Sequence, residues 1–259
     1  MRTIISTYFW FNRESSITHG LSNIRLDTGM IAEPYWGSRD LITDKIAGKD
    51  INFLYKVDRK PIQFELTFSL LEGLWTPEKR FEIARWLIQD DYCEFYTADA
   101  PDRIFYAICI DKGDLLTNGL EQGYVTLRFK NLYPYAMTSV YLQTFDLYNI
   151  SSPIIIEIEN KSNVDKYYYP EIEIQATNTN ITLQNLSDSG RQSIITGFDV
   201  SGETIYINSK NKKIISDVST SNPLSKFNKN WFRLTYGVNR IQVTGKCKLS
   251  IRSQFPIYI

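Results

Sequence analysis

The sequence predicts a mainly β protein with two domains: an N-terminal β-rich domain that carries one α-helix, and a C-terminal β-sandwich. Three observations predict this fold class. The chain has 259 residues, which suits two domains of ordinary size. It contains 17 Tyr and 14 Phe, residue types that favour half-buried strands. After residue 153, short apolar segments alternate with polar turns at spacings of about 8–12 residues, as they do in sandwiches. We expect the domains to cover residues 1–137 and 138–259.

The first domain contains several segments rich in β-branched and aromatic residues. The strands expected there cover residues 2–12, 21–26, 51–57, 61–70, 92–97, 103–110 and 123–132. Residues 51–57 and 61–70 are expected to pair as a hairpin around a turn at 58–61. A second hairpin is expected to join 92–97 to 103–110 around a turn that contains Asp99 and Asp102.

Alternation along one of these strands indicates which side is buried. Ile62, Phe64, Leu66 and Phe68 alternate with polar residues, so one face of this strand is expected to pack on a core. Residues 113–123 are expected to form a loop.

Residues 27–45 do not follow a helical period and are expected to form an extended loop or irregular hairpin. The aromatic and apolar residues of this segment need something to pack against; they are Met30, Ile31, Tyr35 and Trp36.

One helix is expected, from residue 77 to about residue 89. Thr76 is a suitable N-cap, Pro77 suits the first helical position, and Glu78 favours the positive end of the helix dipole. The apolar stripe expected to face the sheet consists of Phe81, Ala84, Leu87 and Ile88, broadened by Trp86.

The second domain is expected to begin with a linker of mild strand character at residues 138–152. Its strands are expected within residues 154–160, 168–175, 180–186, 193–198, 203–209, 212–216 and 248–259. The Asn- and Lys-rich residues 208–213 are expected to be a solvated hairpin tip.

The closing segment KNWFRLTYGVNRIQVTG, residues 229–245, holds three aromatic residues within six positions. Alternation around an expected turn at 237–239 assigns five side chains to the sandwich core: Phe232, Leu234, Tyr236, Ile241 and Val243. Trp231 then lies on the opposite face with Arg233 and Arg240. Two interpretations of Trp231 stay open, a sugar contact and packing against a partner or the other sheet.

Charge and cysteine content argue against several classes of function. Lys plus Arg and Asp plus Glu number 29 each, so the chain has no general attraction for nucleic acid or anionic membranes. No apolar run approaches the roughly 20 residues of a membrane span, and we expect no signal peptide. The three cysteines Cys93, Cys109 and Cys247 lie in apolar segments and are expected to be buried free thiols.

The sequence offers little catalytic chemistry. The single histidine, His19, lies in a Ser- and Gly-containing turn and is expected to be exposed or satisfied there. Asp90 and Asp91 are expected to be exposed residues that help to stop the helix. Alternating Glu157, Glu159, Glu171 and Glu173 are expected to form the wet face of a sheet on neighbouring strands. We therefore expect no catalytic, cofactor-binding or metal-binding residues, and no enzyme.

Five segments together resemble the distal tail protein family of phages with long non-contractile tails. They are FNRESSITHGL (11–21), KIAGKDINFLY with PIQFELTFSL (45–70), the TPE…WL helix with FYTADAPDRIFYA (76–107), GYVTLRFKNLYPYA (123–136) and NWFRLTYGVNRIQVTG (230–245). Arg13 stands where the family's first turn usually has Gly.

The resemblance implies a galectin-like C-terminal sandwich and a structural role without a cofactor. Family members form homo-hexameric rings that join the tail tube protein to the tail-tip hub or fibre protein at the distal end of the virion tail. DNA passes through the lumen, and the C-terminal domains hold receptor-binding proteins. Such a protein is made in the host cytoplasm, binds no specific nucleic acid sequence and does not insert into membranes. We hypothesise that residues 27–45 contact the adjacent subunit of the ring.

Two alternatives to the structural hub remain. The first is a carbohydrate-binding module for host recognition, although the chain has no room for the inserted sugar-binding modules of some family members. The second is a peptidoglycan-cleaving enzyme, which the lack of an acid–base constellation argues against.

Overall fold

The computed structural model of the chain describes residues 3–24, 33–34, 36–110, 113–149, 151–176 and 180–258. The chain divides into two compact units, and we describe each by itself. The first unit is Met1–Thr138 with Tyr258–Ile259, and the second is Ser139–Ile257.

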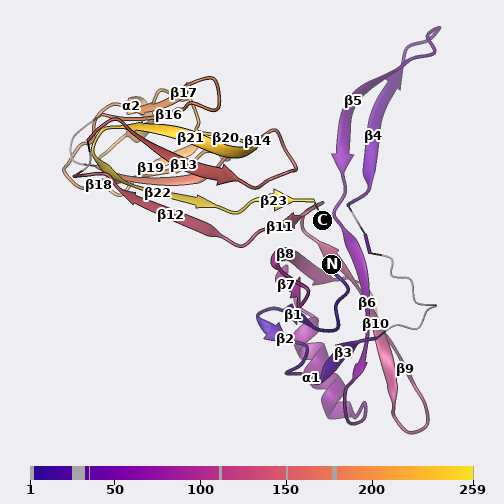
Figure 1. Cartoon of the computed structure of the whole chain (residues 1–259). Helices are drawn as coiled ribbons and strands as arrows, with labels where there is room; N and C mark the ends of the chain where they lie inside the picture. Colours follow the sequence, from indigo (N-terminus) through magenta and orange to yellow (C-terminus); the bar gives the residue numbers. More distant parts are fainter. Residues whose placement is uncertain are drawn as a thin grey trace. The chain divides into compact units, whose positions relative to one another are not determined.

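The first unit is a twisted antiparallel sheet with one helix (Figure 1). Its elements are β1 (Phe9–Phe11), β2 (Glu14–Ser15), β3 (Leu21–Asn23), β4 (Arg39–Lys45), β5 (Asn52–Arg59), β6 (Gln63–Leu70), α1 (Pro77–Leu87), β7 (Cys93–Thr97), β8 (Ala100–Cys109), β9 (Asp114–Thr117), β10 (Gly123–Asn131) and β11 (Ala136–Met137). Neighbouring strands follow the order β2-β1-β7-β8-β10-β6-β3; β9 also pairs with β10, and β11 with β8. The strands β4 and β5 form a two-stranded sheet of their own.

The core of the first unit is aromatic. Buried phenylalanines from five strands form this core: Phe9, Phe11, Phe64, Phe68, Phe95, Phe105 and Phe129. Ring centroids in this cluster lie 4.9 Å apart for Phe64 and Phe95 and 5.6 Å apart for Phe64 and Phe129. The alternation predicted for residues 62–68 is confirmed, because Ile62, Phe64, Leu66 and Phe68 are all at most 3% exposed.

The β1–β2 hairpin turns through Asn12 and Arg13, since Phe11 pairs with Glu14. Both turn residues have positive φ, 50° and 68°. Positive φ at both central residues is the signature of a type I′ turn, for which Asn-Gly is the preferred sequence. Arg13 therefore occupies a position where glycine is the residue free of strain.

Several predicted elements of the first unit are wrong in extent or pairing. Of the strand expected over 2–12, the described residues 3–12 form a strand only at Phe9–Phe11. Residues 114–117, expected within a loop, are a strand, whereas residues 39–45 form one strand of a hairpin, which is one of the two forms expected for 27–45. The strand β5 pairs with β4, whereas β6 pairs with β10 and β3, so the expected hairpin of 51–57 with 61–70 does not form. Alternating residues reveal a strand but carry no information about which strand lies beside it.

The hairpin of β7 and β8 is confirmed, but its turn is shorter than expected. Thr97 pairs with Ala100, so Asp99 lies in the turn while Asp102 belongs to β8. Residues Met30, Ile31 and Tyr35 lie outside the described residues.

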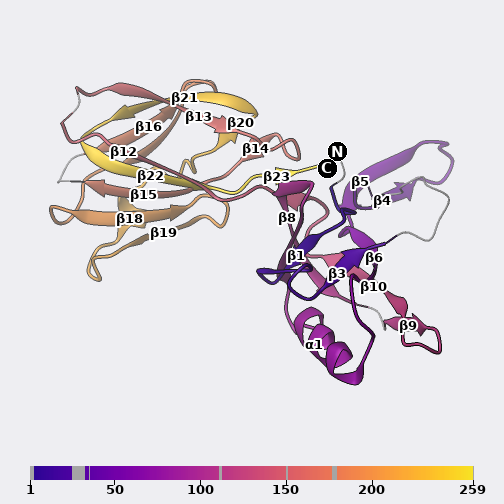
Figure 2. The same cartoon turned by 60° about the horizontal axis from the view of Figure 1, so that its bottom comes forward.

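The second unit is a sandwich of two antiparallel sheets (Figures 1 and 2). Its elements are β12 (Tyr141–Asp146), β13 (Ile154–Asn160), β14 (Tyr167–Tyr168), β15 (Glu171–Ala176), β16 (Ile181–Asn185), β17 (Arg191–Ile195), β18 (Glu203–Asn208), β19 (Lys213–Ser216), α2 (Pro223–Lys226), β20 (Leu234–Thr235), β21 (Gly237–Thr244), β22 (Cys247–Ser253) and β23 (Pro256–Ile257). One sheet has the order β12-β22-β15-β18-β19 and the other β13-β21-β16-β17.

One hydrophobic cluster fills the space between these two sheets. It contains Ile172, Ile174, Ile205 and Ile207 from the first sheet, facing residues such as Leu183 of the second. The mainly β fold class with a helix in the first half is confirmed, and the structure adds the four-residue helix α2.

Three predictions for the second unit are corrected. Residues 141–146, expected within a linker, form the edge strand β12. Residues 154–160 and 168–175 are not neighbours, because β13 and β15 belong to different sheets. Residues 229–245 do not form a hairpin, since β20 pairs with β14 while β21 pairs with β13 and β16.

Candidate assembly surfaces

The β4–β5 hairpin carries apolar side chains that no described residue of its own unit covers. Every residue of β4 is exposed, and in β5 only Asp58 is half-buried. The exposed large hydrophobic residues of the hairpin are Leu41, Ile42, Ile46, Ile51, Phe53, Leu54, Tyr55 and Val57. Figure 1 shows the hairpin extending away from the sheet to which β6 belongs.

The apolar side chains lie on both faces of this hairpin. Leu41 pairs with Val57 and the next residue, Ile42, pairs with Lys56. Because successive side chains of a strand point to opposite faces, Leu41 and Ile42 cannot be buried by one partner surface. An isolated two-stranded hairpin is only marginally stable in water. The hairpin is therefore built to be covered from both sides.

The base of the hairpin is held by one lysine and one glycine. The Lys60 ammonium donates to Asp58 at 2.7 Å and lies 3.1 Å from Asp40, so it joins the two strands. The hydrogen bond from Lys60 lowers the pKa of Asp58. The backbone at Gly37 lies so close to Lys60 that a Cβ atom at residue 37 would overlap the Lys60 carbonyl oxygen. This close approach requires glycine.

A second exposed apolar surface lies on helix α1. Thr76 caps the helix as predicted, accepting a hydrogen bond from the Lys79 amide at 3.3 Å. The predicted apolar stripe is largely wrong. The residues that face the sheet are Ile83, Trp86 and Leu87, whereas Phe81 is 70% exposed and Ile88 is 67% exposed. A helix with apolar residues on most of its circumference buries only the side that the sheet reaches.

Beside α1 lies an apolar groove with a cavity volume of about 220 Å³. Its lining includes Trp75, Ala84 and Ile88 on the helix side, and Leu115 and Val125 on strands β9 and β10. The strands continue past the helix here, so their apolar side chains form the second wall of the groove.

His19 is buried and satisfied rather than exposed. Its ring nitrogens lie 2.8 Å from the Glu14 carboxylate and 2.9 Å from the Glu82 carboxylate, and its ring stacks on Trp86 at 4.1 Å. Lys79 donates to the same Glu82 carboxylate, and the hydrogen bonds from Lys79 and His19 lower its pKa. This cluster links the turn that contains His19 to α1.

The closing segment separates into core and surface residues. Phe232, Leu234, Ile241 and Val243 are buried as predicted, but Tyr236 is 70% exposed and its assignment to the core is wrong. Gly237, with φ of 80°, follows Tyr236 and breaks the alternation that the prediction used.

Trp231 packs against the sandwich core. Its ring makes an edge contact with Phe227 at 5.0 Å, which favours the packing interpretation over the sugar contact. Arg233 forms a bidentate pair with Asp188, at 2.7 and 3.1 Å, and lies over the Tyr167 ring at 3.7 Å. The hydrogen bonds to Asp188 raise the pKa of Arg233.

The outer face of the β12–β19 sheet carries a hollow with a cavity volume of about 420 Å³. On its floor, Glu171 accepts hydrogen bonds from Arg252 at 2.8 Å and from Asn208 at 3.0 Å. Glu173 pairs across the strands with Tyr206, whose side chain is 43% exposed. An aromatic ring beside fixed polar groups is a suitable arrangement for a polar ligand.

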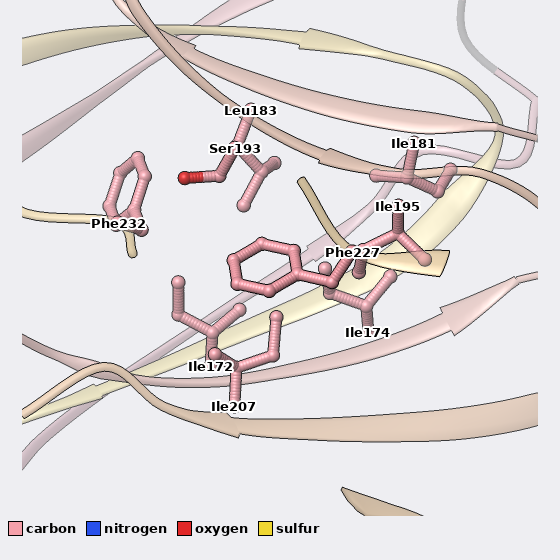
Figure 3. Close-up of a pocket in the computed structure, with 9 residues that line it drawn as sticks. All are labelled: Ile172, Ile174, Ile181, Leu183, Ser193, Ile195, Ile207, Phe227 and Phe232. Carbon is pink, nitrogen blue, oxygen red and sulfur yellow. The ribbon is translucent and has the colours of Figure 1, made fainter. Parts of the chain in front are cut away.

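A much smaller cavity lies inside the core of the sandwich (Figure 3). In Figure 3, Ile172 and Ile207 point toward Leu183 of the opposite sheet, with Phe227 between them and Phe232 to one side. The cavity volume is about 10 Å³, at the lower limit for one water molecule. This space is therefore part of the core packing and not a ligand site.

The remaining predicted side chains play structural or solvated roles. Asp90 and Asp91 are exposed at the helix end, and the four alternating glutamates are exposed as expected, although on two different sheets: Glu157, Glu159, Glu171 and Glu173. Of residues 208–213, expected to be a solvated hairpin tip, 210–213 are exposed, whereas Asn208 is half-buried and Ser209 is buried.

The three cysteines are thiols outside any disulfide, but only one is fully buried. Cys247 is buried, and this burial raises its pKa to about 11, whereas Cys93 and Cys109 are half-buried. The prediction of buried thiols is thus right for Cys247 and wrong in degree for the other two.

Among the described side chains, no three His, Cys, Asp or Glu residues come together as a group that could hold a metal ion. Within the same ranges, neither helix is long and apolar enough to cross a membrane.

Comparisons with known proteins identify the chain at the level of its family. Residues 4–131 match the family model of a phage tail protein N-terminal domain, and residues 135–253 match the model of a phage tail C-terminal domain. The chain belongs to this phage tail protein family. The tail protein is also 28% identical over 251 residues to the SPbeta prophage-derived uncharacterized protein YomH of Bacillus subtilis strain 168, covering 96% of the chain and 97% of YomH.

Solved structures share the fold of this tail protein. The crystal structure of SPP1 Dit (gp 19.1) matches with a TM-score of 0.67 at 13% identity, covering 96% of this chain and 100% of that one. A chain of the phage P2 baseplate in its activated conformation matches with a TM-score of only 0.47 at 9% identity, covering 97% and 98%. The resemblance to distal tail proteins is confirmed at the level of the fold, and the family models show that the protein is a phage tail component.

Proposed function

We propose that this tail protein is the ring-forming hub at the distal end of the tail, a homo-hexamer between the tail tube protein and the tail-tip hub or fibre protein. In this proposal, the ring encloses the lumen for DNA and carries no catalytic activity. The units fold as separate domains over residues 1–137 and 138–259, and the second domain holds receptor-binding proteins.

The observation that carries this proposal is the β4–β5 hairpin. Its apolar side chains lie on both faces and are exposed in the single subunit, so they need a neighbouring chain to cover them. The fold likeness to SPP1 Dit supports the same role, since that protein is described as a paradigm of the hub adsorption apparatus in phages that infect Gram-positive hosts. Residues 39–45 of the segment expected to contact the adjacent subunit belong to this hairpin.

The mass of the purified protein tests the ring. Light scattering at high concentration, with negative-stain images, is expected to show a hexamer of the 30.1 kDa chain. Replacing residues 41–57 by a short Gly-Ser turn is expected to leave a folded monomer. The matched control replaces the exposed turn at residues 210–212 and is expected to keep the hexamer. A hexamer that survives loss of the hairpin would contradict the role of the hairpin, and a strict monomer in the unaltered protein would contradict the ring.

A second candidate function is carbohydrate binding by the C-terminal unit, and the hollow beside Tyr206 favours it. A glycan array with the full chain tests this candidate. Binding that Tyr206→Ala abolishes and Trp231→Ala preserves would establish a sugar site in the hollow. Absence of binding leaves the structural hub as the function of this unit.

A further inference from the structure

The two exposed apolar surfaces of the first unit differ in shape. The β4–β5 hairpin protrudes, and the groove between α1 and strands β9 and β10 is hollow. At the base of the hairpin, Lys60 pairs with Asp40 and Asp58. In the groove the charged lining residue is Arg80, which donates a hydrogen bond to the Trp75 carbonyl at 2.6 Å, and the other lining residues named above are apolar. Both surfaces therefore offer a partner mainly apolar area.

The groove cannot receive the hairpin of its own chain. The hairpin leads into β6 at Gln63, whereas the groove wall formed by Val125 lies opposite Phe68 near the other end of β6. Since β6 has eight residues, the hairpin base and the groove are separated by up to about 26 Å. Figures 1 and 2 agree that the hairpin extends away from the end of the sheet where β9 lies.

Two different surfaces on one chain favour a head-to-tail contact. A two-fold dimer would apply one self-complementary patch twice, whereas a protrusion that enters a separate hollow makes a heterologous contact. Repetition of a heterologous contact generates a closed ring or an open filament. The β4 strand has seven residues, so the hairpin reaches about 23 Å beyond its base, far enough to cross to a neighbouring subunit.

We propose that the α1–β9–β10 groove is the docking site for the β4–β5 hairpin of a second copy of this chain. Apolar side chains from the hairpin, with Ile46 and Ile51 at its tip, pack against Ala84, Ile88 and Leu115 of the next subunit. The volume of about 220 Å³ suits inserted side chains rather than a whole folded segment. This inference rests on the proposed ring and names the contact that propagates it.

Heterotypic cross-linking tests the contact directly. Ile51→Cys, with an affinity tag, and Ile88→Cys, without one, are co-expressed and treated with a short bis-maleimide. Both variants carry Cys109→Ser, because Cys109 lines the groove and would itself react with a docked Ile51→Cys. The expected product is a tagged–untagged dimer well above the background given by the Cys109→Ser chain, which retains Cys93 and Cys247. Each variant expressed alone is expected to give only that background. Self-linking of Ile51→Cys, or no mixed product, would overturn the docking site.

The same experiment separates failure of the inference from failure of the ring. A hexamer without the mixed product overturns the docking site and leaves the proposed function standing. A strict monomer overturns the proposed function, and absence of the mixed product in that sample overturns the docking site as well.

Substitution of the groove provides an independent measurement. Ile88→Asp is expected to weaken subunit association at least tenfold while the thermal unfolding midpoint of the subunit stays unchanged. The matched control is Val238→Asp, in the second unit, where Val238 is 58% exposed and Ile88 is 67% exposed. Equal association in both variants would count against the groove, and the cross-link decides the case if Ile88→Asp does not fold.

Discussion

Strands β5 and β6 follow each other in the chain and have eight residues each, yet β5 is exposed at every residue except Asp58, and β6 is buried on one face. In β6 the apolar residues recur at every second position, and the sheet of the same unit buries that face. In β5 the residues Phe53, Leu54, Tyr55 and Val57 populate both faces. A strand that is apolar on both faces is typical of burial from both sides. The comparison teaches that such a strand, when exposed in a subunit, indicates a surface completed by another chain.

The largest expected effect tests the buried strand. Phe68→Ala removes a fully buried ring and should cost about 3–5 kcal/mol of unfolding free energy, because the surrounding aromatic rings cannot close the space. Urea denaturation of the purified protein measures it. A cost below about 1 kcal/mol would show that β6 does not anchor the core.

The next effect tests the exposed strand with a matched residue. Phe53→Ala should change the stability of the subunit by no more than about 0.5 kcal/mol, because Phe53 is 43% exposed. It should weaken assembly about tenfold, which corresponds to about 1.4 kcal/mol. Sedimentation at several concentrations measures the association. Loss of subunit stability as large as that of Phe68→Ala would remove the distinction between the two strands.

A smaller effect concerns the packed hairpin of β1 and β2. Arg13→Gly should stabilise the protein by roughly 0.5–1 kcal/mol, because the type I′ turn requires positive φ at this position. Thermal unfolding detects the increase. Arg13→Ala serves as the control and should give no gain from the backbone, since alanine meets the same steric conflict.

The smallest effect concerns Glu82 beside His19. The hydrogen bonds from Lys79 and His19 lower the pKa of Glu82 in the folded state. A carboxylate with a lowered folded pKa stabilises the protein above its unfolded value of about 4.3, and this contribution is lost as pH falls through the folded pKa. Since the side chain is 46% exposed, solvent screening keeps the effect below about 1 kcal/mol. Glu82→Gln should therefore unfold at a lower temperature than the unaltered protein at pH 7, and the gap should shrink toward pH 3. An undiminished gap would show that charge plays no part.

The sequence did not predict which strands pair or which side chains meet across the fold. The start of α1 at Thr76 and Pro77 followed from local chemistry, but its buried side did not. Phe81 and Ile88 have the same hydrophobicity as the buried Ile83 and Leu87, so only the position of the sheet separates them. His19 carries no local signal either, because its partner Glu82 is 63 residues away.

By itself, the sequence determined where the main helix and most of the strands form, the alternation that buries Phe64 and Phe68, and the absence of a global charge. Those properties depend on residues within a few positions of one another, through backbone preference, capping and the two-residue period of a strand. Only the tertiary structure decided that β5 pairs with β4, that Tyr236 is exposed, and that a groove lies beside α1. These outcomes depend on which surfaces remain after distant segments have packed, and neighbours in space cannot be read from neighbours in sequence.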